Sequence, residues 1–216
     1  MKRLTREASG LTRTEYGALK KLTTPVKIQD FLDRIPMNWE KKGDTNFTPR
    51  AVLNEQKAHC LEGALLAAAA LWIHGERPLV MNVSARMGKG DVDHVITLYK
   101  RGGRWGAISK TNHATIRFRD PVYKTLRELV LSYFHEWFMN TTGEKTLECY
   151  SRPLDLSRLG PGWITAPDAN GIAEKLGDLP HYFLVPKGNW RYVRPADRME
   201  LQAGRLVEWL KTDRRT

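Results

Sequence analysis

Cysteine and long apolar runs are both scarce in this sequence. Cys60 and Cys149 are the only cysteines among 216 residues, which excludes a small domain held together by several disulfides. The best apolar run, residues 64–73, is too short to span a bilayer, so we expect no membrane span. The first residues are charged and do not resemble a signal peptide. We therefore expect a cytoplasmic protein, whose reducing surroundings would keep a thiol reactive.

Acidic residues are outnumbered by basic ones. The chain has 35 lysines and arginines against 24 aspartates and glutamates, a formal net charge of +11. Residues 100–119 form a basic segment that also contains Trp105 and Phe118. This balance favours an acidic partner, including nucleic acid, or simply a solvated basic surface. No known nucleic-acid-binding motif accompanies the segment.

Three threonine–proline or aspartate–proline pairs predict helix starts. The cap residue satisfies backbone amides, and proline tolerates the first helical position because it has no N–H to lose. Thr24-Pro25 opens one predicted helix, Thr48-Pro49 a second through about residue 54, and Asp120-Pro121 a third containing Leu126 to Trp137. We also expect a short helix near residues 15–22 and a closing helix over residues 199–210.

Strand-like segments follow the central helix. We expect strands at residues 79–83, 94–99 and 105–108, with a hairpin turn at Gly102-Gly103, and further strands at 115–118 and 180–186. Helices followed by antiparallel strands predict an α+β fold. We expect a basic N-terminal arm over residues 1–23 and a single α+β domain over 24–216, with its core at about 48–140.

Cys60 lies where a small-residue helix begins. The helix is predicted from Cys60 to about His74, is apolar nearly all round, and stops at Gly75. A helix N-terminus stabilises a thiolate, which makes Cys60 a candidate nucleophile. His94 starts the apolar strand at 94–99 and is the candidate base. We expect His59 to point away from Cys60, its chain neighbour, and Cys149 to be an inert structural thiol.

These motifs together resemble the transglutaminase-like superfamily of papain-like cysteine enzymes. The resemblance covers about residues 48–120: Cys60-Leu61-Glu62-Gly63-Ala64 on its helix, Asp93-His94-Val95-Ile96, the Gly102-Gly103 turn, and Trp105 leading the next strand. It implies a central helix bearing Cys60 packed on an antiparallel sheet, with additional helices, and a Cys–His–Asp order of catalytic residues.

The third catalytic position departs from the family pattern. Counting on from Trp105, the position that the resemblance assigns to an aspartate holds Ser109. Ser109 or, by analogy with papain, Asn112 would then orient His94. A serine accepts a hydrogen bond but supplies no charge, and a cysteine nucleophile needs less help than a serine does.

Gln56, Glu62 and Trp105 are the candidates for oxyanion stabilisation or substrate binding. The resemblance to papain-like enzymes suggests Gln56 as an oxyanion donor, beside the Cys60 backbone amide. Glu62 complements the helix dipole or lies beside the thiol to hold a substrate amine. No paired-cysteine or His-Glu-x-x-His spacing occurs, so we expect no metal and no cofactor.

The sequence thus predicts acyl transfer or amide hydrolysis through a Cys60 thioester, with His94 as base and then acid. The substrate would be a peptide, a protein or an amide-containing small molecule. Water as acceptor makes a peptidase or amidase, and an amine makes a transglutaminase-type acyltransferase. The alternative is a catalytically silent member that binds nucleic acid or another acidic partner through its basic face.

Overall fold

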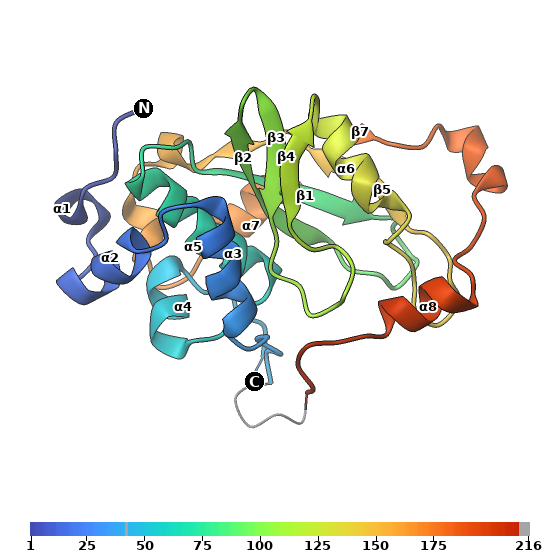
Figure 1. Ribbon diagram of the computed structural model, residues 1–216, viewed down its shortest axis with the longest axis horizontal. Helices are drawn as coiled ribbons and strands as arrows, with labels where there is room; N and C mark the ends of the chain where they lie inside the picture. Colours follow the sequence, from blue (N-terminus) through green and yellow to red (C-terminus); the bar gives the residue numbers. More distant parts are fainter. Residues whose placement is uncertain (42, 212–216) are drawn as a thin grey trace.

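A computed structural model describes residues 1–41 and 43–211 of the chain (Figure 1). The helices are α1 (Arg6–Ser9), α2 (Arg13–Lys20), α3 (Pro25–Arg34), α4 (Pro49–Glu55), α5 (Cys60–Ile73), α6 (Leu126–Phe134), α7 (Asn170–Gly177) and α8 (Arg198–Gly204). The strands are β1 (Leu79–Ala85), β2 (His94–Arg101), β3 (Arg104–Ile108), β4 (Arg119–Tyr123), β5 (Leu147–Ser151), β6 (Leu154–Asp155) and β7 (His181–Phe183). Short 3-10 turns are Leu156–Leu159, Gly162–Ile164 and Lys187–Tyr192.

The strands form one seven-stranded sheet in the order β4-β3-β2-β1-β5-β7, with β6 also paired to β1. The pairings are antiparallel, and the central one joins β1 to β2 with Val83 opposite His94. The α+β class and the packing of a helix on an antiparallel sheet are therefore confirmed. Strands were found close to where the apolar pattern predicts β1, β2 and β3.

Alternation along the central strands supplies two apolar faces. Val80 and Val95 point to one face and join the cluster around α5, whereas Met81 and Ile96 point to the other and join the cluster around α6. Figure 1 shows α1 to α5 gathered on one side of the sheet and α6 on the other. The sheet is covered on both faces, and its N-terminal β2 end meets the start of α5.

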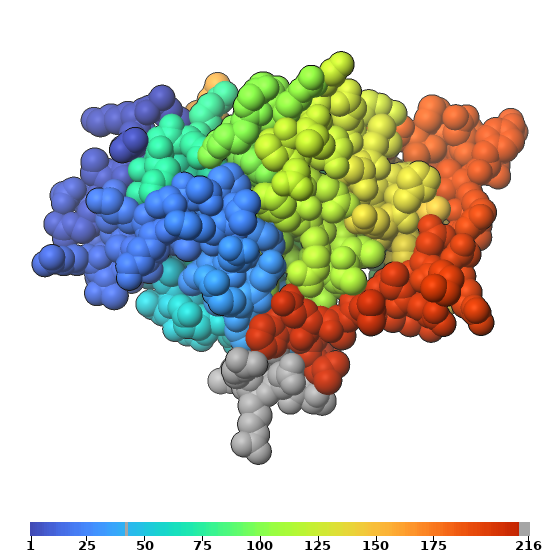
Figure 2. Space-filling view, in the orientation of Figure 1, coloured from blue at the N-terminus to red at the C-terminus, as the bar shows by residue number. Residues whose placement is uncertain are grey.

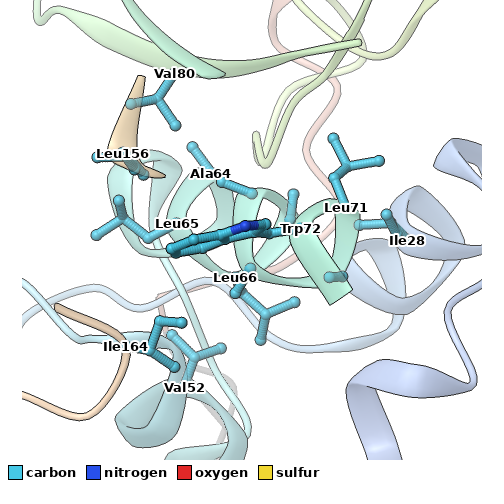
Figure 3. Packing of buried hydrophobic residues seen from close by; sticks show 14 of the residues in the cluster. Ile28, Val52, Ala64, Leu65, Leu66, Leu71, Trp72, Val80, Leu156 and Ile164 are labelled. Carbon is cyan, nitrogen blue, oxygen red and sulfur yellow. The ribbon is translucent and has the colours of Figure 1, made fainter. Parts of the chain in front are cut away.

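Helix α5 is the buried centre of the fold. Every residue from Leu61 to Ile73 is buried, because the helix is surrounded by neighbouring elements (Figure 3). Side chains from α3, α4 and β1 pack around it, among them Ile28, Val52 and Val80. Alanines and Gly63 in its first turns let the sheet approach closely, and the Thr97 hydroxyl donates to the Ala64 carbonyl at 2.6 Å.

Residues 1–23 do more than form a basic arm. Leu4, Leu11 and Leu19 are buried in the same apolar cluster as α5, and the Leu4 amide donates to the Trp72 carbonyl at 3.1 Å. Helix α2 begins with a capping box in which Thr12 and Glu15 satisfy each other's backbone amides. The predicted arm is corrected to two helices packed on the end of α5.

The segment between β3 and α6 also differs from the prediction. The predicted strand at 115–118 is interrupted by Ile116, whose φ is +61°. Strand β4 instead contains Pro121, which an edge strand tolerates because no partner needs the missing N–H. Helix α6 therefore starts at Leu126, where the Thr125 hydroxyl accepts from the Glu128 amide, and not at Asp120-Pro121.

The last third of the chain carries shorter elements than the sequence suggests. Helix α8 ends at Gly204, so the predicted closing helix over 199–210 is too long. Helix α7 was not predicted from the sequence. The predicted strand at 180–186 is limited to β7. Among the described residues, none of the helices is both long and apolar enough to cross a membrane.

Candidate functional site

The start of α5 is fixed by Glu62, a fully buried carboxylate. It accepts hydrogen bonds from the amides of His59 (2.8 Å) and Phe47 (2.9 Å), from the Thr45 hydroxyl (2.8 Å) and from the Asn38 amide group (3.0 Å). A buried carboxylate is stable only when such donors replace water. Glu62 therefore holds residues 38–47 against the helix and sets His59 as its cap.

Cys60 is the first residue of α5 and remains partly exposed. Its backbone amide belongs to the first turn, whose N–H groups have no partner within the helix and carry the positive end of the helix dipole. Ala58, two residues before Cys60, is held to the loop after α3, since the Asn38 amide donates to the Ala58 carbonyl at 3.1 Å. The thiol is thus fixed at a positively polarised end.

His94, the first residue of β2, is oriented by Ser109 at the end of β3. His94 Nε2 and Ser109 Oγ lie 2.7 Å apart, and the Ser109 hydroxyl also lies 2.7 Å from the Ile116 carbonyl. A carbonyl only accepts, so the single hydroxyl proton goes to Ile116 and Ser109 Oγ accepts from Nε2–H. This arrangement leaves Nδ1 of His94 without a proton and available to Cys60.

Ser109 is itself clamped by α3. The Gln29 side chain donates to the Ser109 carbonyl at 2.8 Å and accepts from the Ser109 amide at 3.0 Å. The ring of Trp137 packs edge-on against His94, with centroids 6.1 Å apart. Both contacts restrict the imidazole, which is the requirement for a group that must return to one position in each catalytic cycle.

The Cys60 thiol is strongly acidic. Burial would raise its pKa, but hydrogen bonds and charges from His59 and His94 outweigh burial and lower the pKa from 9.0 to about 5. By contrast, burial raises the pKa of Cys149, which lies on β5 away from this site. Cys60 is therefore the thiolate of the chain near neutral pH, and Cys149 remains a thiol.

His59 also faces Cys60, which corrects the expectation that it points away. Burial opposes its charge, yet the hydrogen bond with Cys60, the charges of Cys60 and Glu62, and the Thr45 carbonyl raise its pKa from 6.5 to about 9. His59 Nε2 donates to Thr45 O at 2.9 Å and lies 3.3 Å from Glu62. The thiol thus lies between two histidines, one anchored by a carboxylate and one by a hydroxyl.

A cavity of about 440 Å³ opens beside Cys60 and His94. Its wall includes apolar side chains such as Met37, Trp39, Ile116 and Trp137. The carboxylates of Asp91, Asp93 and Glu136 also line it, but each accepts hydrogen bonds from the surrounding protein. These acids stiffen the wall, and the cavity is mainly an apolar cleft beside a thiol.

Lys110 is a buried lysine beneath the same cavity. Its Nζ donates to the carbonyls of Leu32 (2.8 Å) and Ile35 (2.6 Å), where α3 ends, and burial lowers its pKa to about 8. A cation at a helix C-terminus satisfies the last carbonyls and complements the dipole. Lys110 therefore ties α3 to β3 and to Gly63 of α5, and its ammonium is occupied by the backbone.

Several predicted site residues lie elsewhere or have other roles. Asn112 lines the cavity but bonds the Trp209 backbone, so Ser109 and not Asn112 is the hydrogen-bond partner of His94. Gln56 is exposed at the end of α4 and donates to Leu53 O, away from the cavity. Trp105 packs in the cluster around α6 under Lys100. Glu62 is fully buried behind His59 and does not reach the cavity.

The sequence reading missed His59, Asn38 and Trp39. Adjacency of His59 to Cys60 argued against a shared site, yet the cap geometry turns the His59 ring back toward the helix start. Trp39 lines the cavity, and its buried indole N–H has no hydrogen-bond partner in the part of the chain that the structure describes. The Glu62 spacing three residues after His59 was the available signal for a capping arrangement.

Within residues 1–41 and 43–211, no cluster of three or more His, Cys, Asp or Glu side chains has the geometry to hold a metal ion. In comparisons with known proteins, no family model matches the chain and no curated protein matches it. The geometry of the site is therefore what indicates the function of the chain.

Proposed function

We propose that the chain is a cysteine enzyme of the transglutaminase-like, papain-like type, which forms a thioester on Cys60. The observation that carries the proposal is the pairing of Cys60 at the start of α5 with His94, whose other ring nitrogen is fixed by Ser109. A nucleophile, a base and an orienting group in this order are what nucleophilic catalysis requires.

In the acylation step, the Cys60 thiolate attacks the carbonyl carbon of an amide and forms a C–S bond. For this step Nδ1 of His94, which is unprotonated in the resting tautomer, first takes up the thiol proton and then gives it to the leaving nitrogen as the C–N bond breaks. The Cys60 backbone N–H at the start of α5 supplies a donor for the oxyanion.

In the deacylation step, water or an amine attacks the thioester while its proton passes to Nδ1 of His94. The C–S bond breaks and the Cys60 thiolate is released. His59 remains outside the proton transfers, because its Nε2 proton is held by Thr45 and Glu62. Its role is to hold positive charge beside the sulfur in both steps.

Ion pairs within the protein weaken the case for the alternative function, a silent module that binds acidic partners through a basic face. Arg101 forms an ion pair with Glu76, Arg119 with Glu136, and Arg117 with Asp33 and Glu208. Cations neutralised within the protein contribute little to a phosphate-binding surface.

The test is a burst experiment with p-nitrophenyl acetate at pH 6, where an ordinary thiol is largely protonated. We expect a burst of one equivalent of p-nitrophenol per chain and an acetyl group on Cys60 by mass spectrometry. The Cys60→Ser variant should lose the adduct, Cys149→Ser should retain it, and His94→Ala should lose turnover. Adding a primary amine would then distinguish hydrolysis from acyl transfer, because transfer yields the acetylated amine. Absence of acetyl-Cys60 in the wild-type chain would contradict the proposal.

A further inference from the structure

Residues 206–209, called the strap here, lie along the rim of the cavity. Helix α8 ends at Gly204, which lines the cavity, and the chain then runs beneath the sheet toward the loop after α3 (Figure 1). Lys211 reaches the ring of Trp39, another cavity residue, at 5.4 Å. Figure 2 shows this segment along the lower edge of the molecule, against α3 and the green part of the chain.

The strap pairs with residues 112–114 through an isolated antiparallel bridge and its flanking hydrogen bonds. Val207 pairs with His113, the Ala114 amide donates to the Leu206 carbonyl at 3.0 Å, and the Glu208 amide donates to the Asn112 carbonyl at 2.9 Å. The Asn112 side chain extends this ladder, since it accepts from the Trp209 amide at 2.8 Å and donates to the Trp209 carbonyl at 3.0 Å. The four hydrogen bonds all bind main-chain atoms of the strap.

The apolar side chains of Leu206 and Val207 contribute little to this docking. Leu206 is 63% exposed and Val207 42% exposed, although both are apolar. Glu208 forms an ion pair with Arg117 at 3.0 Å, on the exposed side. Recognition through the main chain is tolerant of sequence, so another extended peptide offers the same groups.

We propose that the edge formed by residues 112–114 is the docking strand for an extended peptide substrate, and that the strap occupies it as an internal competitor. Asn112 and His113 line the same cavity as Cys60 and His94, so a peptide on this edge lies beside the thiol. The ligand is a polypeptide, because the edge pairs with extended main chain at His113 and presents an asparagine that bonds both the N–H and the C=O of one residue. The inference rests on the proposed function and names its substrate class.

The strap limits access because it is part of the same chain. A tethered segment has an effective concentration in the millimolar range, so a free peptide competes poorly with it. Weakening the strap should therefore expose the edge to peptides in solution.

The experiment measures binding of a fluorescent peptide with the sequence of residues 205–211 to full-length chains carrying Cys60→Ser, which prevents turnover. Glu208→Pro removes the amide that donates to Asn112, and Glu208→Ala is the matched control that loses the carboxylate but keeps the amide. We expect the Glu208→Pro chain to bind the peptide at least tenfold more tightly than the Glu208→Ala chain. A peptide with proline in place of its glutamate should bind less tightly. Equal affinity of the two variants would overturn the proposal.

A second variant tests the pairing without weakening the fold. His113 and Val207 are a non-hydrogen-bonded antiparallel pair, whose side chains are close enough for a disulfide. In the double variant His113→Cys and Val207→Cys, oxidation should form the disulfide and abolish peptide binding, and reduction should restore it. Failure to form the disulfide, or unchanged binding after oxidation, would overturn the proposal. Both readouts are binding measurements, so they stand apart from acetylation of Cys60, which tests the proposed function.

Discussion

His94 Nε2 donates to Ser109 Oγ across 2.7 Å, and the Ser109 hydroxyl in turn donates a hydrogen bond to the Ile116 carbonyl. This relay uses only neutral acceptors, yet it selects one tautomer of the imidazole, as a carboxylate would. What a carboxylate adds is charge, and near Cys60 that charge is supplied from another direction, by Glu62 through His59. His94 is thus the oriented base, and His59 stabilises the charge of the thiolate.

Ser109→Ala should remove the preference of His94 for a single tautomer. Without the Ser109 oxygen, Nε2–H has lost its acceptor, so we expect both neutral tautomers in the ¹⁵N spectrum of the ring and about tenfold slower acetylation of Cys60, about 1.4 kcal/mol in the barrier. The matched control is Ser84→Ala, which removes another buried hydroxyl on β1, outside the residues that line the cavity. Ring shifts identical to the wild type in Ser109→Ala would contradict the relay.

The pH profile of Cys60 alkylation should reflect its low pKa. A pKa near 5 means that the thiolate persists as pH falls to about 5, so the iodoacetamide rate should stay high at pH 6 and decline only through pH 5. Replacing His59 or His94 by alanine removes one stabilising neighbour and should raise the inflection by about 1–3 units.

The rate of turnover should distinguish the role of His59 from that of His94 in the same alanine variants. His59→Ala should raise the inflection and still complete deacylation, whereas His94→Ala should stop deacylation because it removes the base. Cys149→Ser should leave the profile unchanged. An inflection near 8.5, the value of a free thiol, would mean that the histidines do not activate Cys60.

Glu62→Gln should be strongly destabilising. Both oxygens of the carboxylate accept hydrogen bonds from backbone and side-chain N–H donors. The amide of a glutamine would place its own N–H₂ donor against these donors in a buried space. We expect a loss of about 3 kcal/mol in the free energy of unfolding, measured by urea denaturation. Glu55→Gln on α4, an exposed position, is the control and should change stability by less than about 0.5 kcal/mol. Similar effects at both positions would show that Glu62 does not organise the helix start.

Gly63→Ala should destabilise the contact between α5 and the segment that follows β3. A Cβ at Gly63 would lie 2.5 Å from Lys110 Cβ, so the helix would have to move away from this segment. We expect a loss of about 1–3 kcal/mol in the free energy of unfolding. Gly17→Ala in α2 meets nothing within 4 Å and should instead stabilise by about 0.5–1 kcal/mol. Thermal denaturation of both variants measures the difference, and a neutral Gly63→Ala would contradict the close approach.

Local signals in the sequence predicted the elements that carry the site. Thr24-Pro25, Thr48-Pro49 and the alanine-rich run after Cys60 predicted α3, α4 and α5 because capping and helix propensity depend on neighbouring residues alone. The same local rule failed at Asp120-Pro121, where pairing with β3 made these residues an edge strand. Pairing depends on distant residues, which a local pattern does not contain.

The sequence by itself determined the helix that begins at Cys60 and the strands that follow, including the apolar run that starts at His94. Those properties follow from capping, turn chemistry and the period of apolar residues. The tertiary structure decided which polar groups meet: Ser109 with His94, Glu62 with His59, and Asn112 with the strap. Each of these contacts depends on distances set by packing of the sheet on α5 and α3. A spacing along the chain does not specify such distances, because the same side chain can serve as an orienter, a cap or a strand partner.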